Sequence, residues 1–395
     1  MNGSLRHRPL RSFSGTLVVA AACAALVAPT RARAAEAKDY RFGMVLALTG
    51  PGSWYGVTMS RGAELAAEEI NAAGGAAGFR LVPVIEDHRS GDTSAGQAAV
   101  RKLIDIDKVP YIEGSYGSVC TSVQPLCAEN KVVLVNGGGT APSLLNKPFL
   151  HNTRALGDTT AIAVLKYLKE ERGCKRLATV FYNQESGITI NREATKAWKA
   201  WGGTVVKEAM VATGQTDFTG EISQLRAARP ECIGIWSYGT DVGYTVKDIR
   251  RLGLVVPVAG VEFTPDAYAI AGKAFEGFLT GLDDFDPELK DPLTQRFVKA
   301  FHKKYGADAK LDYYCANYYD LTYVLKELIT RVKAKGGNPF DGAQLEAALR
   351  EKPKFETVYG GTMELRPDGG VVKPISIFEV RNGKQARVKR VGGGA

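Results

Sequence analysis

Residues 42–75 read FGMVLALTGPGSWYGVTMSRGAELAAEEINAAGG, and this stretch is the clearest sign of the fold class. It opens with an apolar run over residues 42–48, passes through a glycine-rich loop, and continues in an amphipathic segment over residues 60–73. One helical face of that segment carries Ala63, Ala66, Ala67 and Ile70. Gly74 and Gly75 then provide a helix stop. A short strand, a glycine turn and a helix are typical of one unit of a parallel α/β sheet.

The same alternation continues along most of the chain. Apolar runs predict strands at residues 42–48, 81–86, 110–113, 132–135, 177–182, 204–210, 232–236 and 256–261. Amphipathic segments predict helices at residues 60–73, 159–171, 191–201, 218–228 and 243–252. Alternation of this kind predicts parallel sheets covered by helices on both faces. Because the strands are too many for one sheet and the pattern restarts near residue 156, we expect two α/β lobes.

From about residue 290 the regular alternation of predicted strands and helices ends. Helices are predicted at residues 293–305 and 313–334, and residues 345–350 form part of a shorter one. Strands are predicted at residues 355–365 and 373–380, with the sequence PDGG as a turn between them.

Composition places the protein among globular chains. Its 395 residues are 45% hydrophobic and 24% charged, with a net charge of +9. Five of the positive charges are arginines within residues 1–34, a segment without acidic residues, and removing five from +9 leaves +4. We therefore do not expect a nucleic-acid or membrane-surface binding protein.

Residues 1–34 are typical of a secretory signal peptide. Arg6, Arg8 and Arg11 precede a short apolar region at residues 15–28, and Ala32-Arg33-Ala34 offers a cleavage site. A membrane anchor is the alternative, but the apolar run is shorter than the roughly 20 residues that span a bilayer. Lipidation at Cys23 is a second alternative, although the preceding alanines lack the usual large aliphatic residue. We expect an exported, soluble, periplasmic protein.

Five cysteines follow the signal peptide, and they do not form a metal-binding pattern. The chain has no C-x-x-C sequence, and His88, His151 and His302 are far apart along it. Cys174 and Cys232 each precede a predicted strand, so they would come within disulfide reach if those strands are parallel neighbours. Two free thiols in the core are the alternative.

Glycine-rich loops follow three predicted strands in the first half, at residues 49–56, 114–118 and 136–140. Ligands of open α/β sheets bind beyond the carboxyl ends of the strands. Glycine-exposed amides and hydroxyl groups at helix N-termini suit one carboxylate or another small anion. Each loop alone is also an ordinary turn, and their recurrence at successive strand ends is what favours a binding site.

The second half offers polar loops at equivalent strand ends, at residues 184–187, 236–241 and 260–263. Glu262 follows an apolar run and would suit a ligand ammonium if it faces a cleft. Its alternative interpretation is a solvated loop acid. No catalytic signature is present, whether a G-x-S-x-G elbow, H-E-x-x-H or a phosphate-binding loop, so we predict no catalytic residues, cofactor or metal.

From about residue 40 to residue 380 the sequence resembles the type I periplasmic solute-binding proteins of branched-chain amino acid ABC transporters, the Leu/Ile/Val-binding proteins. The matching motifs are Leu48-Thr49-Gly50-Pro51, Tyr55-Gly56, Gly62-Ala63, Glu69-Ile70-Asn71, Gly74-Gly75, residues 137–140, Asp217-Phe218 and residues 250–253. The resemblance implies two doubly wound lobes joined by three hinge crossings, near residues 155–158, 281–284 and 356–361. It assigns residues 35–156 plus 283–356 to lobe 1, and residues 157–282 plus 357–395 to lobe 2.

The resemblance also implies the ligand-binding residues, which are Tyr55, Ser118, Gly138, Thr140, Ser186, Tyr238 and Glu262. In this family a serine and a small residue–threonine pair hold the ligand carboxylate, roles that fall on Ser118, Gly138 and Thr140. The acid that takes the amino group corresponds to Glu262. The family often has Tyr-Gly where this chain has Ser186-Gly187, which removes one aromatic wall.

By this resemblance the protein captures an amino acid between closing lobes and delivers it to an ABC transporter permease. A branched-chain or similar aliphatic amino acid is the expected ligand. The alternatives are an amide, a urea or an aromatic carboxylate, and a sensory module in place of a transport component. A monomer without nucleic-acid partners is expected.

Overall fold

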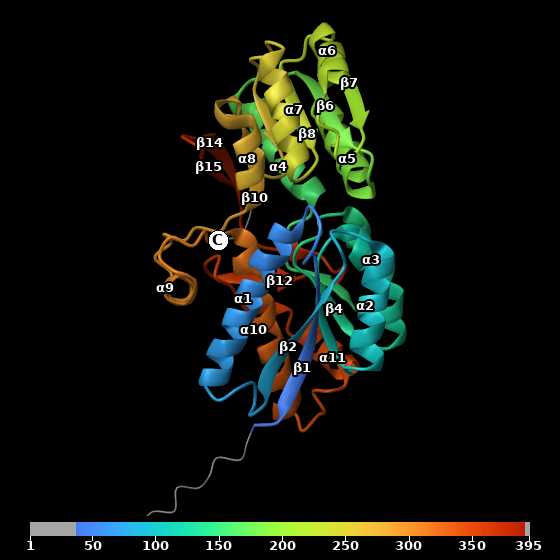
Figure 1. The fold of residues 1–395 in the computed structure, drawn as a ribbon, viewed down its shortest axis with the longest axis vertical. Coiled ribbons are helices and arrows are strands. Elements are labelled where there is room, and N and C mark those ends of the chain that lie inside the picture. Colours follow the sequence, from blue (N-terminus) through green and yellow to red (C-terminus); the bar gives the residue numbers. More distant parts are fainter. Residues whose placement is uncertain (1–36, 392–395) are drawn as a thin grey trace, which may run out of the picture. The chain divides into compact units, whose positions relative to one another are not determined.

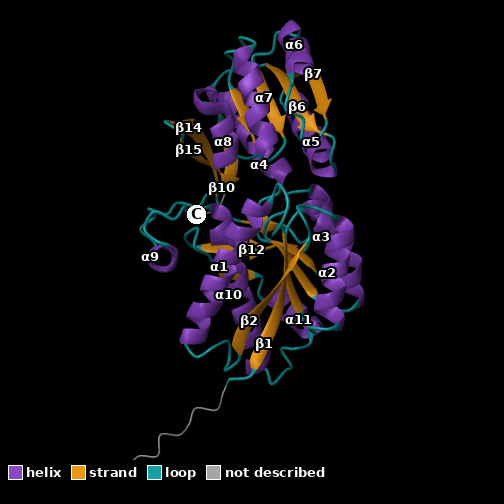
Figure 2. Cartoon of the chain, viewed as in Figure 1, coloured by secondary structure: helices purple, strands orange, loops and turns teal. Residues whose placement is uncertain are grey.

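The computed structural model describes residues 37–391, so the predicted signal peptide lies outside the described residues (Figure 1). The described strands form two large sheets and one small sheet, with helices packed on them (Figure 2). The predicted α/β class with two main sheets is confirmed.

The first sheet is entirely parallel and is formed by the strands that precede residue 153. Its order is β2-β1-β3-β4-β5, with bounds Arg80–Asp87, Asp39–Leu46, Tyr111–Gly114, Val133–Asn136 and Leu150–Asn152. Every residue of β3 and β4 is buried, as expected for strands covered on both faces. The connecting helices are α1 (Ser53–Ala72), α2 (Thr93–Asp105), α3 (Gly117–Glu129) and the 3-10 helix η1 (Pro142–Leu144). Helices α2 and α3 pack side by side (Figure 1).

Helix α1 begins at Ser53, earlier than the predicted start at residue 60. The amide of Ser53 donates to the carbonyl of Gly50, which has a φ of +85°, so the helix grows directly out of the glycine turn. Tyr55 therefore lies in the first turn of α1. At Gly56 an added Cβ would lie 2.0 Å from the carbonyl oxygen of Ala47, so only glycine allows this close approach to the end of β1.

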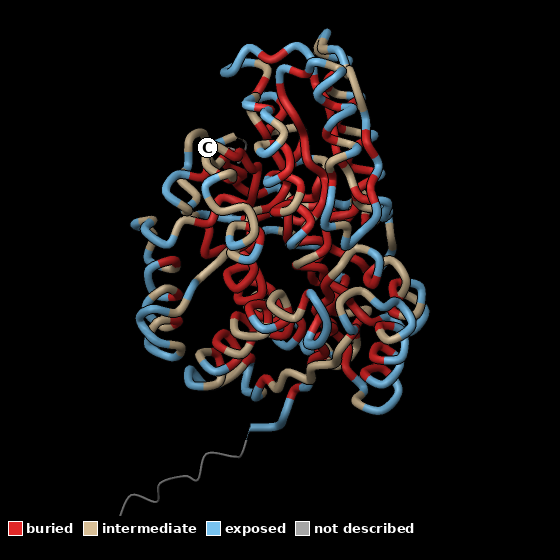
Figure 3. Tube along the Cα trace, turned by 45° about the horizontal axis from the view of Figure 1, so that its top comes forward, coloured by how far each residue is buried: buried red, intermediate tan, exposed pale blue. Residues whose placement is uncertain are grey.

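The second sheet contains five parallel strands and an antiparallel hairpin at one edge. Its order is β15-β14-β10-β9-β8-β6-β7, with bounds Lys384–Val391, Ile375–Arg381, Leu279–Asp283, Val258–Gly260, Cys232–Trp236, Arg176–Tyr182 and Thr204–Val211. Its helices are α4 (Gly157–Glu171), α5 (Glu185–Ala200), α6 (Thr219–Ala227), α7 (Thr240–Arg251), α8 (Pro265–Ala271) and the 3-10 helix η2 (Gly272–Phe275). The buried segments of the chain run through the strands of these sheets, and exposed ones lie at the margins (Figure 3).

The segment between β10 and β14 packs with the first sheet. It contains α9 (Pro292–Tyr305), α10 (Tyr313–Ala334), α11 (Gly342–Glu351) and a small sheet of β11 (Lys354–Glu356), β12 (Thr362–Leu365) and β13 (Val371–Val372). Residues 313–322 of α10 are all buried, and the apolar side chains among them join those of β1 and α1 in one core. At Gly62 an added Cβ would lie 2.1 Å from the carbonyl oxygen of Cys315, so α1 and α10 are in close contact.

The strand predicted at residues 355–365 is instead two antiparallel strands, with Phe355 paired to Met363. Gly360 and Gly361 have φ values of +83° and +78°, which turn the chain between them. The predicted PDGG turn is present, but it joins β12 to β13 rather than to β14.

The chain passes between the two large sheets three times: after β5, after β10 and before β14. The first two passages lie near the predicted residues 155–158 and 281–284. For the third we expected residues 356–361, but Met363 and Leu365 belong to the core of the first sheet. This packing favours a passage at residues 373–374, with the small sheet on the side of lobe 1.

A buried ion pair joins all three passages. Lys373, with a side chain that is 0% exposed, lies 3.3 Å from a carboxylate oxygen of Asp283. The ammonium also donates to the carbonyl of Thr153 and to the side chain of Asn317. The other oxygen of Asp283 accepts the amide of Ala155. The Lys373–Asp283 ion pair therefore connects the three segments of chain that pass between the two large sheets.

The buried carboxyl group of Asp320 is expected to make the stability of the protein depend on pH. Asp320 of α10 accepts hydrogen bonds from the hydroxyl of Thr357 and the amide of Val358, and burial raises its pKa from 3.8 to about 7. Between these two values the folded chain binds a proton that the unfolded chain has released. The contribution of Asp320 to stability is therefore present below pH 4 and is lost as the pH rises towards 7.

Asp320→Asn is expected to remove this contribution. Across pH 4.5–6.5 the free energy of unfolding of the parent should fall relative to the variant by up to about 1.4 kcal/mol per pH unit. Urea unfolding at several pH values measures both slopes, and Asp308→Asn, at an exposed position, is the control. Parallel curves for the parent and Asp320→Asn would contradict the assignment.

Candidate functional site

The predicted site residues lie where strands of both sheets end. The carboxyl ends of β3 and β4 lead into loops at residues 115–116 and 137–141, and β1 leads into α1. In the second sheet, β8 and β9 lead into loops at residues 237–239 and 261–264. These strand ends are the usual ligand-binding edge of an open α/β sheet.

Glu262 is buried, with 1% of its surface exposed, and its carboxylate accepts three hydrogen bonds. The hydroxyl of Tyr55 and the amide of Gly239 donate to one oxygen, and the hydroxyl of Tyr314 donates to the other, each at 2.7 Å. The interpretation of Glu262 as a solvated loop acid is therefore wrong. Tyr55 and Tyr314 come from α1 and α10, so this carboxylate connects the loop after β9 to helices packed on the first sheet.

Tyrosines surround this carboxylate. The ring centroid of Tyr55 lies 5.3 Å from that of Tyr314 and 6.1 Å from that of Tyr116. Burial, together with the nearby Glu262 carboxylate, raises the pKa of Tyr55 well above its ordinary value. Burial likewise raises the pKa of Tyr238 to about 12. Both phenols stay protonated at neutral pH, and the Tyr55 hydroxyl donates to the Glu262 carboxylate.

Thr140 and Tyr238 form a second connection between the two sheets, because their hydroxyl groups are hydrogen-bonded to each other. Asn136, at the end of β4, fixes the loop that carries Gly138 and Thr140. Its side-chain oxygen accepts the amides of Gly138 and Gly139, and its side-chain nitrogen donates to the carbonyl of Gly139. The predicted residues Gly138 and Thr140 therefore lie on a loop that Asn136 holds by hydrogen bonds, and Thr140 contacts Tyr238 of the second sheet.

Ser186 lies at the start of α5, and its hydroxyl is hydrogen-bonded to that of Tyr182. The Tyr182 ring lies 5.9 Å from the Tyr238 ring. Tyr182, the last residue of β6, thus supplies an aromatic surface beside the position at Ser186 where the family often has a tyrosine. The sequence reasoning missed it because Tyr182 was read as the last residue of a core strand.

Ser118 is exposed on the first turn of α3, and the hydrogen bonds that connect the other predicted residues do not include it. Ser115 is the buried serine of this loop. Its hydroxyl donates to the carbonyl of Val45 and lies 2.8 Å from Nε2 of His88. Nδ1 of His88 accepts the amide of Gly91, so Nε2 carries the proton. Burial lowers the pKa of His88 to about 4, which keeps this histidine neutral.

Arg154, just after β5, is the main residue that sequence reasoning missed. It is 4% exposed, and its guanidinium donates to the carbonyl of Gly138 and to the hydroxyl of Tyr314, at 2.8 and 2.9 Å. It also lies over the rings of Tyr313 and Tyr314, 5.1 and 4.6 Å from their centroids. Among the described residues no carboxylate lies within ion-pair distance of Arg154. A permanently charged group therefore lies between the loop of Gly138 and a donor to Glu262.

Within residues 37–391, no cluster of three or more His, Cys, Asp and Glu side chains could hold a metal ion. No helix in the same range is long and apolar enough to cross a membrane.

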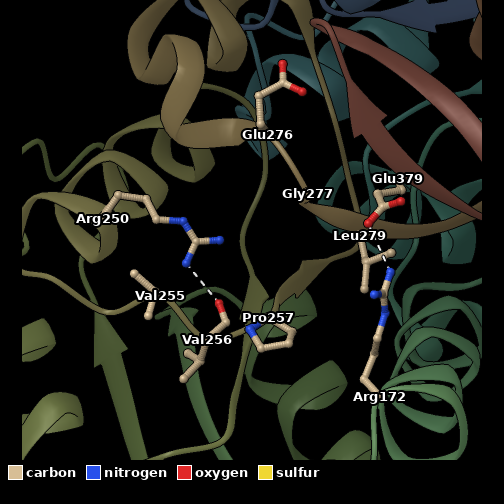
Figure 4. Close-up of a pocket in the computed structure, with 9 residues that line it drawn as sticks. All are labelled: Arg172, Arg250, Val255, Val256, Pro257, Glu276, Gly277, Leu279 and Glu379. Atoms are coloured by element: carbon tan, nitrogen blue, oxygen red, sulfur yellow. Dashed lines mark hydrogen bonds and ion pairs between the residues drawn. The ribbon is translucent and has the colours of Figure 1, made fainter.

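A surface pocket of about 230 Å³ lies elsewhere, at the amino ends of β9 and β10 (Figure 4). Its charged residues already have partners. Arg172 pairs with Glu379, and Arg250 donates to the carbonyl of Val256. None of the predicted site residues lines this pocket.

Two α/β sheets with polar and aromatic side chains gathered at their facing strand ends define a protein that binds a small solute. The chain belongs to the periplasmic binding protein family, whose model matches residues 39–385. The resemblance identified from the sequence is therefore confirmed.

Individual relatives agree with this membership. The chain is 26% identical over 357 residues to the Leu/Ile/Val-binding protein homolog 3 of Brucella melitensis, covering 88% of this chain and 92% of that one. A leucine-binding protein from Thermotoga maritima has a similar fold, with a TM-score of 0.81 at 23% identity, covering 89% of this chain and 99% of the other. So does an ABC transporter solute-binding protein from R. palustris, solved with benzoate, with a TM-score of 0.77 at 22% identity and coverage of 90% and 96%.

Proposed function

We propose that the protein captures a small carboxylate-bearing solute in the periplasm and delivers it to the permease of an ABC transporter. Family membership supports the class of function. The observation that carries the first candidate ligand, an amino acid, is the buried carboxylate of Glu262, bonded to Tyr55 and Tyr314 at the facing strand ends. The Glu262 carboxylate is 1% exposed, so it would make a strong and selective contact with a solute enclosed beside it.

An amino acid is the first candidate ligand, as the relationship to Leu/Ile/Val-binding proteins suggests. In this proposal the loop of Gly138 and Thr140 binds the ligand carboxylate through amide and hydroxyl donors. Glu262 accepts the ligand ammonium, replacing one or both of its tyrosine donors. This exchange would leave no charged protein group unpaired, because Tyr55 and Tyr314 are neutral donors.

An aromatic carboxylate is the second candidate, and Arg154 is the observation that favours it. A buried guanidinium without an acidic partner would pair well with an anionic ligand. The rings of Tyr55, Tyr116, Tyr182 and Tyr238 offer aromatic surfaces at the same strand ends. The benzoate complex of the R. palustris protein shows that this fold can hold such a ligand. Here Glu262 would remain bonded to its own tyrosines.

A thermal-shift screen of the chain from residue 35 tests both candidates. A ligand at about 1,000 times its dissociation constant adds about 4 kcal/mol to stability. A shift with leucine or isoleucine that is lost when the amine is acetylated supports the amino-acid candidate. A shift with benzoate or 4-hydroxybenzoate but no free amino acid supports the second. No shift with any small carboxylate would contradict the proposal.

The alternative to transport is signalling, in which ligand binding by the same site would activate a sensor kinase. Transport predicts that the ligand-loaded protein stimulates ATP hydrolysis by its reconstituted permease–ATPase complex. Failure to do so, together with stimulation of a neighbouring sensor kinase, would favour signalling.

A further inference from the structure

The thiols of Cys174 and Cys232 meet at the amino ends of two neighbouring parallel strands. In the register of β6 and β8, Cys232 is the partner of Leu177, and Cys174 lies in the loop just before β6. This loop folds back on the second strand, because the amide of Glu231 donates to the carbonyl of Arg176 and the amide of Lys175 donates to the carboxylate of Glu231.

The sulfur atoms are correspondingly close. Sγ of Cys174 lies 3.7 Å from the carbonyl oxygen of Glu231, the group bonded to the nitrogen of Cys232. Sγ of Cys232 lies 3.9 Å from the carbonyl oxygen of Arg176, on the other strand. The side chains are also close enough that the Cys232 thiol lowers the pKa of Cys174. Each thiol thus reaches across the strand pair towards the other.

We propose that Cys174 and Cys232 form a disulfide bond that links β6 to β8. The bond would close a loop containing β6, α5, β7 and α6, and would add a covalent link to the backbone hydrogen bonds that pair β6 with β8. Both residues are buried, at 3% and 0% exposure, so the bond would be shielded from reductants once formed. It would form during folding or during local opening of the loop at residues 172–175.

The chemistry needs an oxidant, which we name as a disulfide compound such as oxidised glutathione. The Cys174 thiolate attacks one sulfur of glutathione disulfide, and a glutathione thiolate leaves. Cys232 loses its proton and attacks the sulfur of Cys174, and the second glutathione thiolate leaves. The two cysteines together lose two electrons and two protons, and the oxidant becomes two glutathione thiols. The nearby Cys232 thiol lowers the pKa of Cys174, which favours Cys174 as the first nucleophile.

The remaining described cysteines do not compete for this bond. Cys120 and Cys127 lie on the same helix, α3, seven residues apart, which separates their Cα atoms by about 10 Å. Disulfides span no more than about 6.8 Å between Cα atoms. Burial raises the pKa of Cys127 to about 12 and also raises those of Cys120 and Cys315, so these three thiols are poor nucleophiles.

The chain from residue 35, refolded in a glutathione redox buffer, gives a direct test. Before alkylation, mass spectrometry should find a mass 2 Da below that of the reduced chain. After acid quenching, denaturation and alkylation, three of the five cysteines should be labelled. Peptide mapping without reductant should find Cys174 linked to Cys232. Reduction of the folded protein should lower its Tm by several degrees.

Single variants separate this bond from other oxidation products. Cys174→Ser and Cys232→Ser should each leave four alkylatable thiols and lose the Tm response to reductant, whereas Cys127→Ser should keep the linked peptide. Five labelled cysteines in the parent, a glutathione adduct as the final product, or a link to Cys120, Cys127 or Cys315 would each overturn the proposal. The parent measurement decides the question even if a variant fails to fold. Ligand binding is not part of the readout, so the proposed function is tested separately.

Discussion

Glu262→Gln is expected to lower the affinity for an amino-acid ligand by at least about 100-fold. In the proposed complex the ligand ammonium is enclosed beside a carboxylate that is 1% exposed. Glutamine keeps the size of the side chain and removes its charge, which leaves the ammonium without an ionic partner. Breaking a buried pair in this way costs about 3–5 kcal/mol, and each 1.4 kcal/mol is about tenfold in affinity. Isothermal titration calorimetry of the parent and the variant measures the difference.

The matched control is Asp266→Asn, which removes an exposed carboxylate four residues further along the chain and should leave affinity unchanged. Circular dichroism and the Tm of both variants establish that they are folded. An affinity for Glu262→Gln within tenfold of the parent would contradict the role of Glu262. If the ligand is an aromatic carboxylate, the large loss should instead follow Arg154→Gln, since Arg154 then pairs with the ligand.

Lys373→Met should destabilise the free protein by about 3–5 kcal/mol, because it leaves the carboxylate of Asp283 buried without its cation. The same change removes hydrogen bonds to Thr153 and Asn317, so all three passages of the chain lose a shared contact. Methionine has a similar length and fills the space of the lysine stem. Urea unfolding monitored by tryptophan fluorescence gives the free energy of unfolding.

Two comparisons isolate the ion pair. Lys384→Met removes an exposed lysine from β15 and should change stability by less than about 0.5 kcal/mol. Adding Asp283→Asn to Lys373→Met removes the unpaired charge as well and should recover part of the loss. A loss below about 1 kcal/mol for Lys373→Met alone would show that Asp283 is well solvated or otherwise paired without the lysine.

The parts of the fold that could be predicted are those encoded by sequence patterns within a few residues. Apolar runs of strand length, followed by glycine turns and amphipathic segments, correctly predicted most strands of both large sheets and several of their helices. The short strands β5 and β10, the edge strand β15 and the helices α2 and α8 were not predicted. The glycine loop at residues 49–56 was correctly placed, but Ser53 begins the helix because the turn at Gly50 supplies its first hydrogen bond. The error at residues 355–365 has a similar origin. An apolar run does not reveal a reversal when Gly360 and Gly361 provide it inside the run.

The candidate site was predictable only where it follows strand ends. Gly138, Thr140, Tyr238 and Glu262 come directly after apolar runs, so their place at the edge of a sheet follows from the order of elements. Ser118 was chosen by the family resemblance, yet it is exposed on α3, and Ser115 is the buried serine of that loop. Which of two nearby serines is buried depends on the helix that begins between them.

By itself, the sequence determined the alternation of strands and helices, the two sheets and the polar strand ends, because each of these depends on neighbours within a few residues. Tertiary structure alone decided the partners of the buried charges. Tyr314 reaches Glu262 from a helix that returns to the first sheet, and Lys373 meets Asp283 across 90 residues of sequence. Charges far apart along the chain come together only when the packing of α1 against α10 and the three passages fixes their positions. No pattern within a few residues of the sequence predicts these long-range contacts.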